Sequence, residues 1–548
     1  MSNYPHYLTR LQDATRKYWD KPALNTIGGE SLTYAEMATS IARFHIIFEK
    51  AGFKKGDKIS LCANNGARWG FAYLAVNTYE TVIVPILSDF TPESVMGLVN
   101  HSDSIALFTN AARWKKMDPE KMPALKVVFD VDNWDVLLCR DEKIADAVAH
   151  WDELFAAKYP NGFGPDDVKF PTNNWDDLAV INYTSGSTGD PKGVMLSYRN
   201  FSANIDFAQR AIPAGERMVS MLPMAHMYGL AFEFLYPLSN GCAIYWMAKA
   251  PTPAALIKAF SDVKPYQLIT VPLVMEKIYK SKVKPTLEKP LIKFLTKIPG
   301  VNILIYKKVK NGLLAAFGGK CERFIMGGAP LNPEAEKLFR RIKLPYLVGY
   351  GMTEACPLLA YECWEKYVPG SCGKCVDVAE VRIDSEDPQH VVGEIQARGE
   401  NIMIGYYKNE EATANAFTED GWLRTGDLGI IDAEGNIFIR GRSKNMILGP
   451  SGQNIYPEEL EAVVNNQPFV MESVVVDRGG KLVALVFLDE QAVAKSLLDS
   501  EAKAEIPENI RLGANRQLPG YSQIAKVELM DKPFEKTPKM SIRRFLYK

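Results

Sequence analysis

The chain has 548 residues, more than one hydrophobic core accommodates, so two or three domains are expected. Its 47% hydrophobic and 24% charged residues are typical of globular proteins, and a net charge of −1 argues against a nucleic-acid binder that relies on bulk charge. The N-terminus shows no signal-peptide pattern. The most apolar long stretch, residues 218–246, contains His226, Glu233 and several Gly and Pro residues, which favours buried strands and helices over a membrane span. We therefore expect a soluble, cytoplasmic protein with no nucleic-acid partner.

The first 180 residues alternate patterns of helix and strand. Thr33, with Glu36 three positions later, fits a capping box, and apolar residues then recur at helical spacing from Met37 to Ile47. Residues 69–79 also have a helical pattern. Apolar runs that predict strands lie at residues 56–62, 81–87, 104–109, 126–130 and 178–182. This alternation predicts an α/β fold with a mostly parallel sheet.

A glycine- and hydroxyl-rich stretch follows the last of these strands. Residues 183–193 read Tyr-Thr-Ser-Gly-Ser-Thr-Gly-Asp-Pro-Lys-Gly. Glycines let the backbone approach a ligand closely, while hydroxyls, amides and Lys192 offer partners for phosphate oxygens. Ser/Thr/Gly clusters are also common in ordinary connecting loops. The loop differs from the NTPase P-loop, because Pro191 and not glycine precedes Lys192.

The order of residues in this loop resembles the signature loop of the adenylate-forming superfamily, which includes acyl-CoA synthetases, adenylation domains of peptide synthetases and beetle luciferases. Further matching segments follow in the family's order at residues 324–331, 347–354 and 422–429, and the resemblance covers nearly the whole chain. It is strongest to long-chain fatty acyl-CoA synthetases. The family fold implies a large N-terminal domain of layered, mostly parallel sheets with helices at residues 1–443. A small mobile α+β lid would follow at residues 444–548, with its hinge at Lys444. Within it we expect strands at residues 473–477 and 482–488 and a helix near residues 490–500.

The resemblance also implies an ATP site and assigns catalytic residues. Lys192, Thr353 and Glu354 would act in catalysis, with Glu354 holding magnesium. Tyr350 would stack on adenine, and the Asp427 carboxylate would accept hydrogen bonds from the ribose hydroxyls. The implied ATP-binding residues are Thr184, Ser185, Gly186, Ser187, Thr188, Gly189, Gly328, Ala329, Tyr350, Gly351, Met352, Thr353, Asp427 and Arg442.

The acyl side of the site is implied at His226, and more weakly at Tyr228. Without the family, His226 in an apolar segment reads more simply as a core histidine. The implied reaction joins a medium- or long-chain fatty acid to CoA through an acyl-adenylate, consuming ATP with magnesium and releasing AMP and pyrophosphate. Two alternatives remain open: delivery of the acyl group to a carrier-protein thiol, and a degenerate protein that binds acyl-adenylate or ATP with weak turnover.

The C-terminal motif departs from the family pattern. In the family, a lysine four positions after a threonine neutralises the carboxylate and α-phosphate as acyl-AMP forms. Counting from Thr537 gives Ser541 instead. Lys539 lies two residues earlier, about 7 Å away along an extended segment, and would replace that lysine only if the loop rearranges.

Two other clusters allow more than one interpretation. Residues 272–322 resemble the fatty-acid enzymes and are rich in lysine interleaved with apolar residues. Such a run indicates a solvated helix face or, as the alternative, peripheral contact with an anionic membrane. Four cysteines, Cys356, Cys363, Cys372 and Cys375, would suit zinc, but only the last pair has the usual tight spacing and the family carries no metal there.

Overall fold

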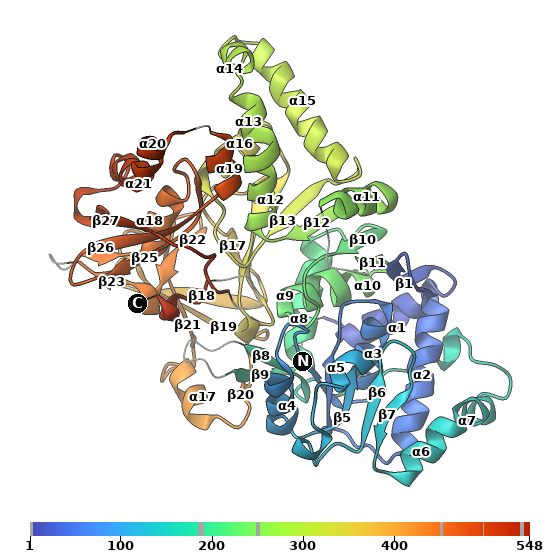
Figure 1. The fold of residues 1–548 in the computed structure, drawn as a ribbon. Coiled ribbons are helices and arrows are strands. Elements are labelled where there is room, and N and C mark those ends of the chain that lie inside the picture. The colour runs from blue at the N-terminus through green and yellow to red at the C-terminus, as the bar shows by residue number, and fades with distance from the viewer. Residues whose placement is uncertain are drawn as a thin grey trace.

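The computed structural model describes residues 4–184, 191–247, 253–449, 453–496, 498–536 and 542–547. Figure 1 shows a large part, coloured blue to orange, and a smaller C-terminal part in red that lies against one side of it. The large part is built of several sheets with helices, and the small part has its own sheet, helices and apolar core. The predicted α/β class with an additional α+β unit is confirmed.

The largest sheet has eight strands in the order β20-β9-β8-β4-β3-β5-β6-β7. The five strands from β8 to β6 are parallel, and the outer strands β20, β9 and β7 pair antiparallel with their neighbours. Their bounds are β3 (Lys58–Cys62), β4 (Val82–Pro85), β5 (Ser104–Thr109), β6 (Val127–Asp130), β7 (Val136–Cys139), β8 (Leu178–Thr184), β9 (Lys192–Ser197) and β20 (Gly405–Tyr406). All five strands expected from apolar runs lie in this sheet, as buried parallel strands should.

Helix α2 (Tyr34–Lys50) begins at the predicted capping box. The Thr33 hydroxyl accepts a hydrogen bond from the Glu36 amide, and the Glu36 carboxylate accepts one from the Thr33 amide. The predicted helix at residues 69–79 is α3 (Ala67–Asn77). The other helices of this region are α1 (Tyr7–Lys17), α4 (Pro92–His101), α5 (Ala111–Trp114), α6 (Glu142–Ala149), α7 (Trp151–Lys158) and α8 (Tyr198–Ala211).

The apolar stretch at residues 218–246 is core, as predicted. It forms β10 (Arg217–Ser220), α9 (Met227–Gly229), a π-helix at Leu230–Leu235, α10 (Tyr236–Leu238) and most of β11 (Ala243–Met247). These strands pair with β1 (Pro22–Ile27) and β2 (Ser31–Thr33) in a second sheet of order β10-β11-β1-β2. Within the described ranges, no helix is both long and apolar enough to cross a bilayer.

A third sheet contains the parallel strands β12 (Gln267–Thr270), β13 (Arg323–Met326) and β14 (Tyr346–Val348). Helix α11 (Pro253–Val263) precedes it, and α16 (Pro333–Arg341) connects β13 to β14. A long helical excursion joins β12 to β13, and its outer helices α14 and α15 project from the body (Figure 1). The excursion contains α12 (Pro272–Ile278), a π-helix at Tyr279–Val283, α13 (Lys284–Leu287), α14 (Pro290–Leu295) and α15 (Val301–Ala316).

Antiparallel strands complete the large part. A four-stranded sheet has the order β18-β19-β21-β22, and a three-stranded one the order β15-β16-β17. The bounds are β15 (Tyr350–Gly351), β16 (Leu358–Tyr361), β17 (Lys374–Cys375), β18 (Ala379–Asp384), β19 (Gly393–Gly399), β21 (Leu423–Ile431) and β22 (Ile437–Arg442), with α17 (Glu410–Ala416) before β21.

The C-terminal part follows a 3-10 turn at Ser443–Asn445. It consists of β23 (Ile447–Leu448), β24 (Asn454–Ile455), α18 (Pro457–Val464), β25 (Val470–Asp477), β26 (Leu482–Leu488), α19 (Glu490–Lys495), α20 (Ser500–Ala504), α21 (Ile506–Asn515) and β27 (Lys526–Leu529). Both predicted strands are present. The helix expected near residues 490–500 is shorter, because α19 ends at Lys495 and Asp499 caps a separate helix α20.

Candidate active site

The two ends of the glycine-rich loop lie side by side. Strand β8 ends at Thr184 and strand β9 begins at Lys192, and these residues are opposite one another in the antiparallel pairing. Ser185, Gly186, Ser187, Thr188 and Gly189 lie outside the described residues. Gly193 has no room for a side chain, because an added Cβ would lie 2.9 Å from the Ile181 Cγ2 atom. The pairing fixes Lys192 at the start of β9, beside the end of β8.

Lys192 and Glu354 are linked through Tyr406, which the sequence analysis did not single out. Strand β20 pairs with β9, and the Lys192 Nζ atom lies 4.9 Å from the centre of the Tyr406 ring. The Tyr406 hydroxyl donates a hydrogen bond to Glu354 Oε1 at 2.9 Å. Burial and the Glu354 charge both raise the pKa of Tyr406, so its hydroxyl stays protonated and remains a donor. A lysine, a tyrosine and a carboxylate thus form one cluster.

Tyr350, Asp427 and Arg442 form a second cluster. Asp427 is 4% exposed. Its carboxylate accepts a hydrogen bond from the Tyr350 hydroxyl at 2.7 Å and forms an ion pair with Arg442, whose Nε atom is 2.6 Å away. Asp427 and Arg442 are opposite one another on β21 and β22, which explains the close pairing. Burial raises the pKa of Asp427, and the Arg442 charge opposes that rise. All three residues were predicted from the sequence as site residues, but their mutual contacts were not.

The two glycine-containing segments that the resemblance assigns to the ATP site, residues 324–331 and 347–354, lie close together. The Gly349 amide donates to the Met326 carbonyl at 2.8 Å, which joins the end of β13 to the start of β15. Gly328 has a φ of +83°, a conformation that favours glycine. An added Cβ on Gly351 would lie 2.1 Å from the Pro357 carbonyl oxygen. The neighbouring residues Ala329, Met352 and Thr353 follow these turns, and Thr353 is buried.

His226 and Tyr228 lie beside the β13 turn. The His226 Nδ1 atom accepts a hydrogen bond from the Tyr228 amide, and His226 caps α9. The Tyr228 hydroxyl donates to the Ile325 carbonyl at 3.2 Å. The Tyr228 ring packs against Gly327, where an added Cβ would lie 3.2 Å from the Tyr228 Cζ atom. Strand β8 also reaches this region, since the side-chain amide of Asn182 donates to the Ala225 carbonyl at 2.8 Å.

Glu233 holds the segment that leads to His226, and the sequence analysis gave it no role. Its carboxyl group is fully buried and accepts hydrogen bonds from the Ser220 hydroxyl and the Leu222 amide, each at 2.8 Å, and from the Met221 amide. Burial raises the pKa of Glu233 to about 8, although these hydrogen bonds oppose the rise. A lone acidic residue in an apolar run was the only sequence signal for it.

The C-terminal part contacts the large part through several polar groups. Lys280 Nζ donates to the Asn465 carbonyl at 3.0 Å, and Asn332 donates to Asn466 at 2.7 Å. Lys444 is exposed in the turn that connects the two parts. Lys536 pairs with Glu472 at 2.5 Å within the C-terminal part. Lys539 and Ser541 lie outside the described residues.

Magnesium is compatible with the Glu354 cluster. No three His, Cys, Asp or Glu side chains come together to hold a metal ion in the part of the chain that the structure describes. A single carboxylate suits magnesium, which keeps several waters and takes its other ligands from substrate phosphates. Tyr406 donates a hydrogen bond to one Glu354 oxygen. Among the described contacts, the other Glu354 oxygen accepts no hydrogen bond that would compete with an ion.

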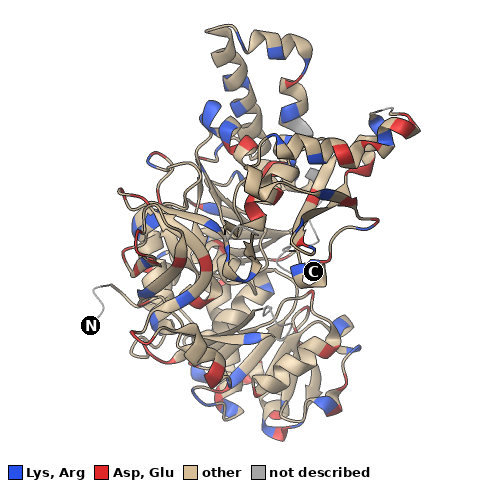
Figure 2. Cartoon of the chain, turned by 90° about the vertical axis from the view of Figure 1, so that its left-hand side faces the viewer, with Lys and Arg blue, Asp and Glu red and all other residues tan. Residues whose placement is uncertain are grey.

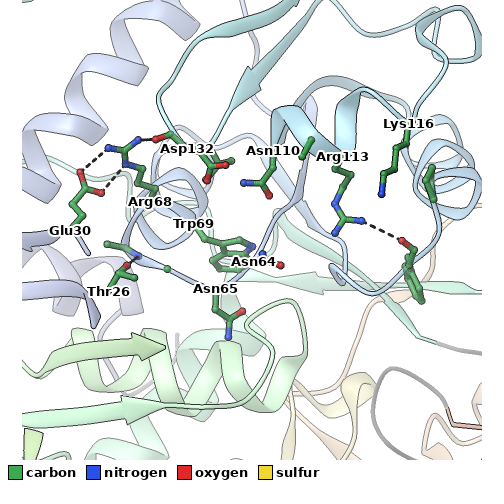
Figure 3. Close-up of a pocket in the computed structure, with 16 residues that line it drawn as sticks. Thr26, Glu30, Asn64, Asn65, Arg68, Trp69, Asn110, Arg113, Lys116 and Asp132 are labelled. Atoms are coloured by element: carbon green, nitrogen blue, oxygen red, sulfur yellow. Dashed lines mark hydrogen bonds and ion pairs between the residues drawn. The ribbon is translucent and has the colours of Figure 1, made fainter. Parts of the chain in front are cut away.

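A cavity of about 750 Å³ lies elsewhere, beyond the carboxyl ends of β3, β5 and β6 (Figure 3). Its polar lining includes Arg68, which is bound to Glu30, and Arg113, which donates to the Ser88 carbonyl. None of the residues predicted for the ATP or acyl site lines it. It is therefore separate from the two clusters described above.

Comparisons with known proteins follow the same division of the chain. The profile of the AMP-binding enzyme family matches residues 11–407, and that of the AMP-binding enzyme C-terminal domain matches residues 444–547. The long-chain-fatty-acid–CoA ligase FadD15 of Mycobacterium bovis is 26% identical over 94% of this chain and 90% of its own. A long-chain-fatty-acid–CoA ligase of Yersinia pestis is 26% identical over 99% and 93%. ATP-bound MatB from Rhodopseudomonas palustris, 23% identical over 99% and 98% of the two chains, shares the fold with a TM-score of 0.77.

Proposed function

From the premise that this chain belongs to the AMP-binding enzyme family, we propose that it activates a medium- or long-chain fatty acid as its acyl-adenylate and transfers the acyl group to CoA. The coarser activity, AMP-forming ligation of an acid to CoA, follows from the family and its relatives. The observation that carries the proposal is the Lys192–Tyr406–Glu354 cluster, which offers a cation and a carboxylate beside the glycine-rich loop. Two relatives named as long-chain-fatty-acid–CoA ligases support the fatty acid.

In the first half-reaction, a carboxylate oxygen of the fatty acid attacks the α-phosphorus of ATP. The new O–P bond forms as the bond to the β-phosphate breaks, and pyrophosphate leaves with the electron pair. Lys192 balances the negative charge that spreads over the phosphates, and catalysis consists mainly of positioning and electrostatic stabilisation. Magnesium held at Glu354 would add positive charge at the same phosphates. The substrate itself supplies the nucleophile, so no side-chain nucleophile is required.

Asp427 would hold the ribose hydroxyls, and Tyr350 and Arg442 would keep its carboxylate oriented. The turns at Gly328–Ala329 and Tyr350–Thr353 would enclose the adenine and the α-phosphate. His226 and Tyr228 would line the acyl side, where Glu233 fixes the backbone before His226. These roles rest on the contacts described and on the family's motifs.

In the second half-reaction, the thiol of CoA attacks the carbonyl carbon of the acyl-adenylate. A carbon–sulfur bond forms, AMP leaves with the electron pair, and the thiol proton passes to solvent. We propose that residues 444–548 act as a lid that turns about Lys444 between the two half-reactions, so that one site serves both. Lys539 is the candidate to stand in for the lysine that Ser541 replaces.

The test is fatty-acid-dependent exchange of labelled pyrophosphate into ATP across a series of chain lengths, with AMP release measured with and without CoA. We expect exchange that increases towards medium or long chains and AMP release that requires CoA. An aromatic acid such as 4-coumarate and a dicarboxylic acid serve as controls for other acid classes. Preference for either control acid would refute the fatty-acid proposal, and exchange without CoA-dependent AMP release would refute CoA as the acceptor.

A further inference from the structure

The helical excursion between β12 and β13 ends in a projecting hairpin, which we define as residues 290–316, comprising α14 and α15. Figure 1 shows these two helices extending beyond the rest of the molecule, joined by a short turn at the far end. No residue from 284 to 312 is buried. The hairpin is held towards its base, where Leu313 and Phe317 enter the core of the third sheet and the partly buried Tyr306 and Val309 pack against that core.

The free end of the hairpin exposes large apolar side chains. Of sixteen such side chains that the described residues expose, five lie within positions 291–304. They are Leu291 (68% exposed), Phe294 (62%), Ile298 (36%), Ile303 (66%) and Leu304 (68%). Single exposed apolar residues are normal on a protein surface, but a contiguous group marks a site of interaction with a protein or a membrane.

The charge of this segment has one sign. Residues 289–321 contain seven lysines and no acidic residue, although the whole chain has a net charge of −1. Figure 2 shows the lysines along the two projecting helices. They are Lys289, Lys293, Lys297, Lys307, Lys308, Lys310 and Lys320. The surface that binds the hairpin should therefore be anionic as well as apolar.

The apolar and basic residues are ordered along α15. Ile303 and Leu304 face solvent in its first turn, and Lys307 and Lys308 face solvent one turn later. Four residues of helix separate the pairs by about 6 Å along the axis. Apolar side chains of interfacial helices enter the boundary between headgroups and acyl chains by about 5–10 Å, with lysines at the headgroup level. The order and spacing of the two pairs match that boundary.

We propose that the hairpin inserts its free end into an anionic lipid bilayer: Phe294, Ile303 and Leu304 enter the acyl-chain boundary while Lys307 and Lys308 bind headgroup phosphates. An acidic protein is the other surface with suitable charge. The bilayer is favoured because the apolar residues lie on the convex end of a projection, which a fluid membrane accepts without a matching concave pocket.

The helical excursion that carries the hairpin begins and ends beside the acyl side of the candidate active site. The excursion leaves β12 directly after Thr270, whose carbonyl is 3.5 Å from the Tyr228 hydroxyl. It returns through β13, whose Ile325 carbonyl binds the same hydroxyl. Insertion would thus bring the acyl side towards the membrane that dissolves long-chain acids. This orientation rests on the proposed function, whereas membrane binding itself does not.

The experiment is sedimentation of the full chain with vesicles of phosphatidylcholine alone or mixed with anionic phosphatidylglycerol, at low and high salt. We expect binding to the anionic vesicles that weakens with salt. Ile303→Ser with Leu304→Ser should reduce partition by about 100-fold or more, from the lost apolar burial. Lys307→Gln with Lys308→Gln should reduce it by about 30-fold, from about 1 kcal/mol per lysine near an anionic surface.

Matched controls are Val391→Ser, which is 53% exposed on a distant loop, and the exposed pair Lys115→Gln with Lys116→Gln. Both controls should bind as the wild type does. Pyrophosphate exchange without vesicles should be unchanged in every variant, which shows that they fold and keeps this test separate from that of the proposed function. Ile303→Trp should gain a blue-shifted fluorescence that brominated acyl chains quench.

Failure of the wild type to bind anionic vesicles would overturn the proposal and leave an acidic protein as the occupant. Binding that the two hairpin variants retain in full would also overturn it, because another surface would then be responsible. Vesicle binding without quenching at Ile303→Trp would refute insertion.

Discussion

Replacing Tyr406 by phenylalanine removes one hydroxyl and leaves the ring that faces Lys192. The hydroxyl lies 2.9 Å from Glu354 Oε1, and a hydrogen bond to a charged group contributes about 1.5–3 kcal/mol. Since Tyr406 is only half-buried, we take the lower part of that range. About 1.4 kcal/mol changes a rate tenfold, so the adenylation rate should fall by about 10- to 30-fold. The loss should be greatest at limiting magnesium, because the hydrogen bond orients the carboxylate proposed to hold it.

Tyr406→Leu separates the two contacts of this side chain. It removes the hydroxyl and also the ring, whose centre is 4.9 Å from Lys192 Nζ. A partly exposed cation–π contact contributes about 0.5–1 kcal/mol, so a further loss of about two- to fivefold is expected. The assay is pyrophosphate exchange at a saturating acid concentration over a magnesium titration.

Tyr407→Phe is the matched control, because the neighbouring tyrosine donates an equivalent hydrogen bond, 2.7 Å long, to Asp103 at the surface. It should change the exchange rate less than twofold. If Tyr406→Phe retains the wild-type rate at every magnesium concentration, the link from Tyr406 to Glu354 has no catalytic role. Equal losses in Tyr406→Phe and Tyr407→Phe would indicate a general effect on β20 and would equally refute the reasoning.

Three further predictions concern other parts of the site. Asp427→Asn should lower kcat/KM for ATP by about 100-fold, because the buried carboxylate that would accept the two hydrogen bonds from the ribose hydroxyls is lost. ATP titrations in the exchange assay measure this change. Burial raises the pKa of Glu233 from 4.5 to about 8, so the folded chain favours the neutral carboxyl group. The stability of the folded chain should therefore fall as the pH rises from about 4.5 through about 8. Thermal unfolding measured across this pH range should show that Glu233→Gln lacks this loss of stability. Lys539→Ala should slow adenylation, whereas Lys536→Ala, which loses only its pair with Glu472 within the C-terminal part, should not. Equal rates for Lys539→Ala and the wild type would exclude Lys539 as the substitute for the missing lysine.

Local sequence signals were sufficient for much of the fold. The Thr33–Glu36 capping box located the start of α2 because both hydrogen bonds lie within one turn. The five apolar runs located the parallel strands because strands buried on both faces are apolar along their length. The helix expected at residues 490–500 was too long, because the local cap at Asp499 that starts α20 was not recognised.

The contacts within the site were harder to predict. Tyr406 reaches Lys192 only because β20 pairs with β9, more than 200 positions away in the sequence, and no periodicity encodes that pairing. Asp427 and Tyr350 were expected to touch different parts of ATP, and nothing in their motifs indicates that one binds the other. The motifs identified residue types suited to the chemistry, whereas long-range strand pairing determined which of them meet.

The same pairing explains how the cluster around Glu354 is held. The Tyr407 amide donates to the Gly193 carbonyl at 2.7 Å, and the Ile404 amide to the Met195 carbonyl at 2.9 Å, so β20 is bound to β9 on both sides of Tyr406. The Met403 amide donates to the Glu354 carbonyl at 2.8 Å, which ties the backbone of Glu354 to the segment just before β20. Backbone hydrogen bonds thus join the three segments that carry Lys192, Tyr406 and Glu354. Their relative positions consequently depend on the sheet, and the side chains need only adopt the right rotamers to form the cluster.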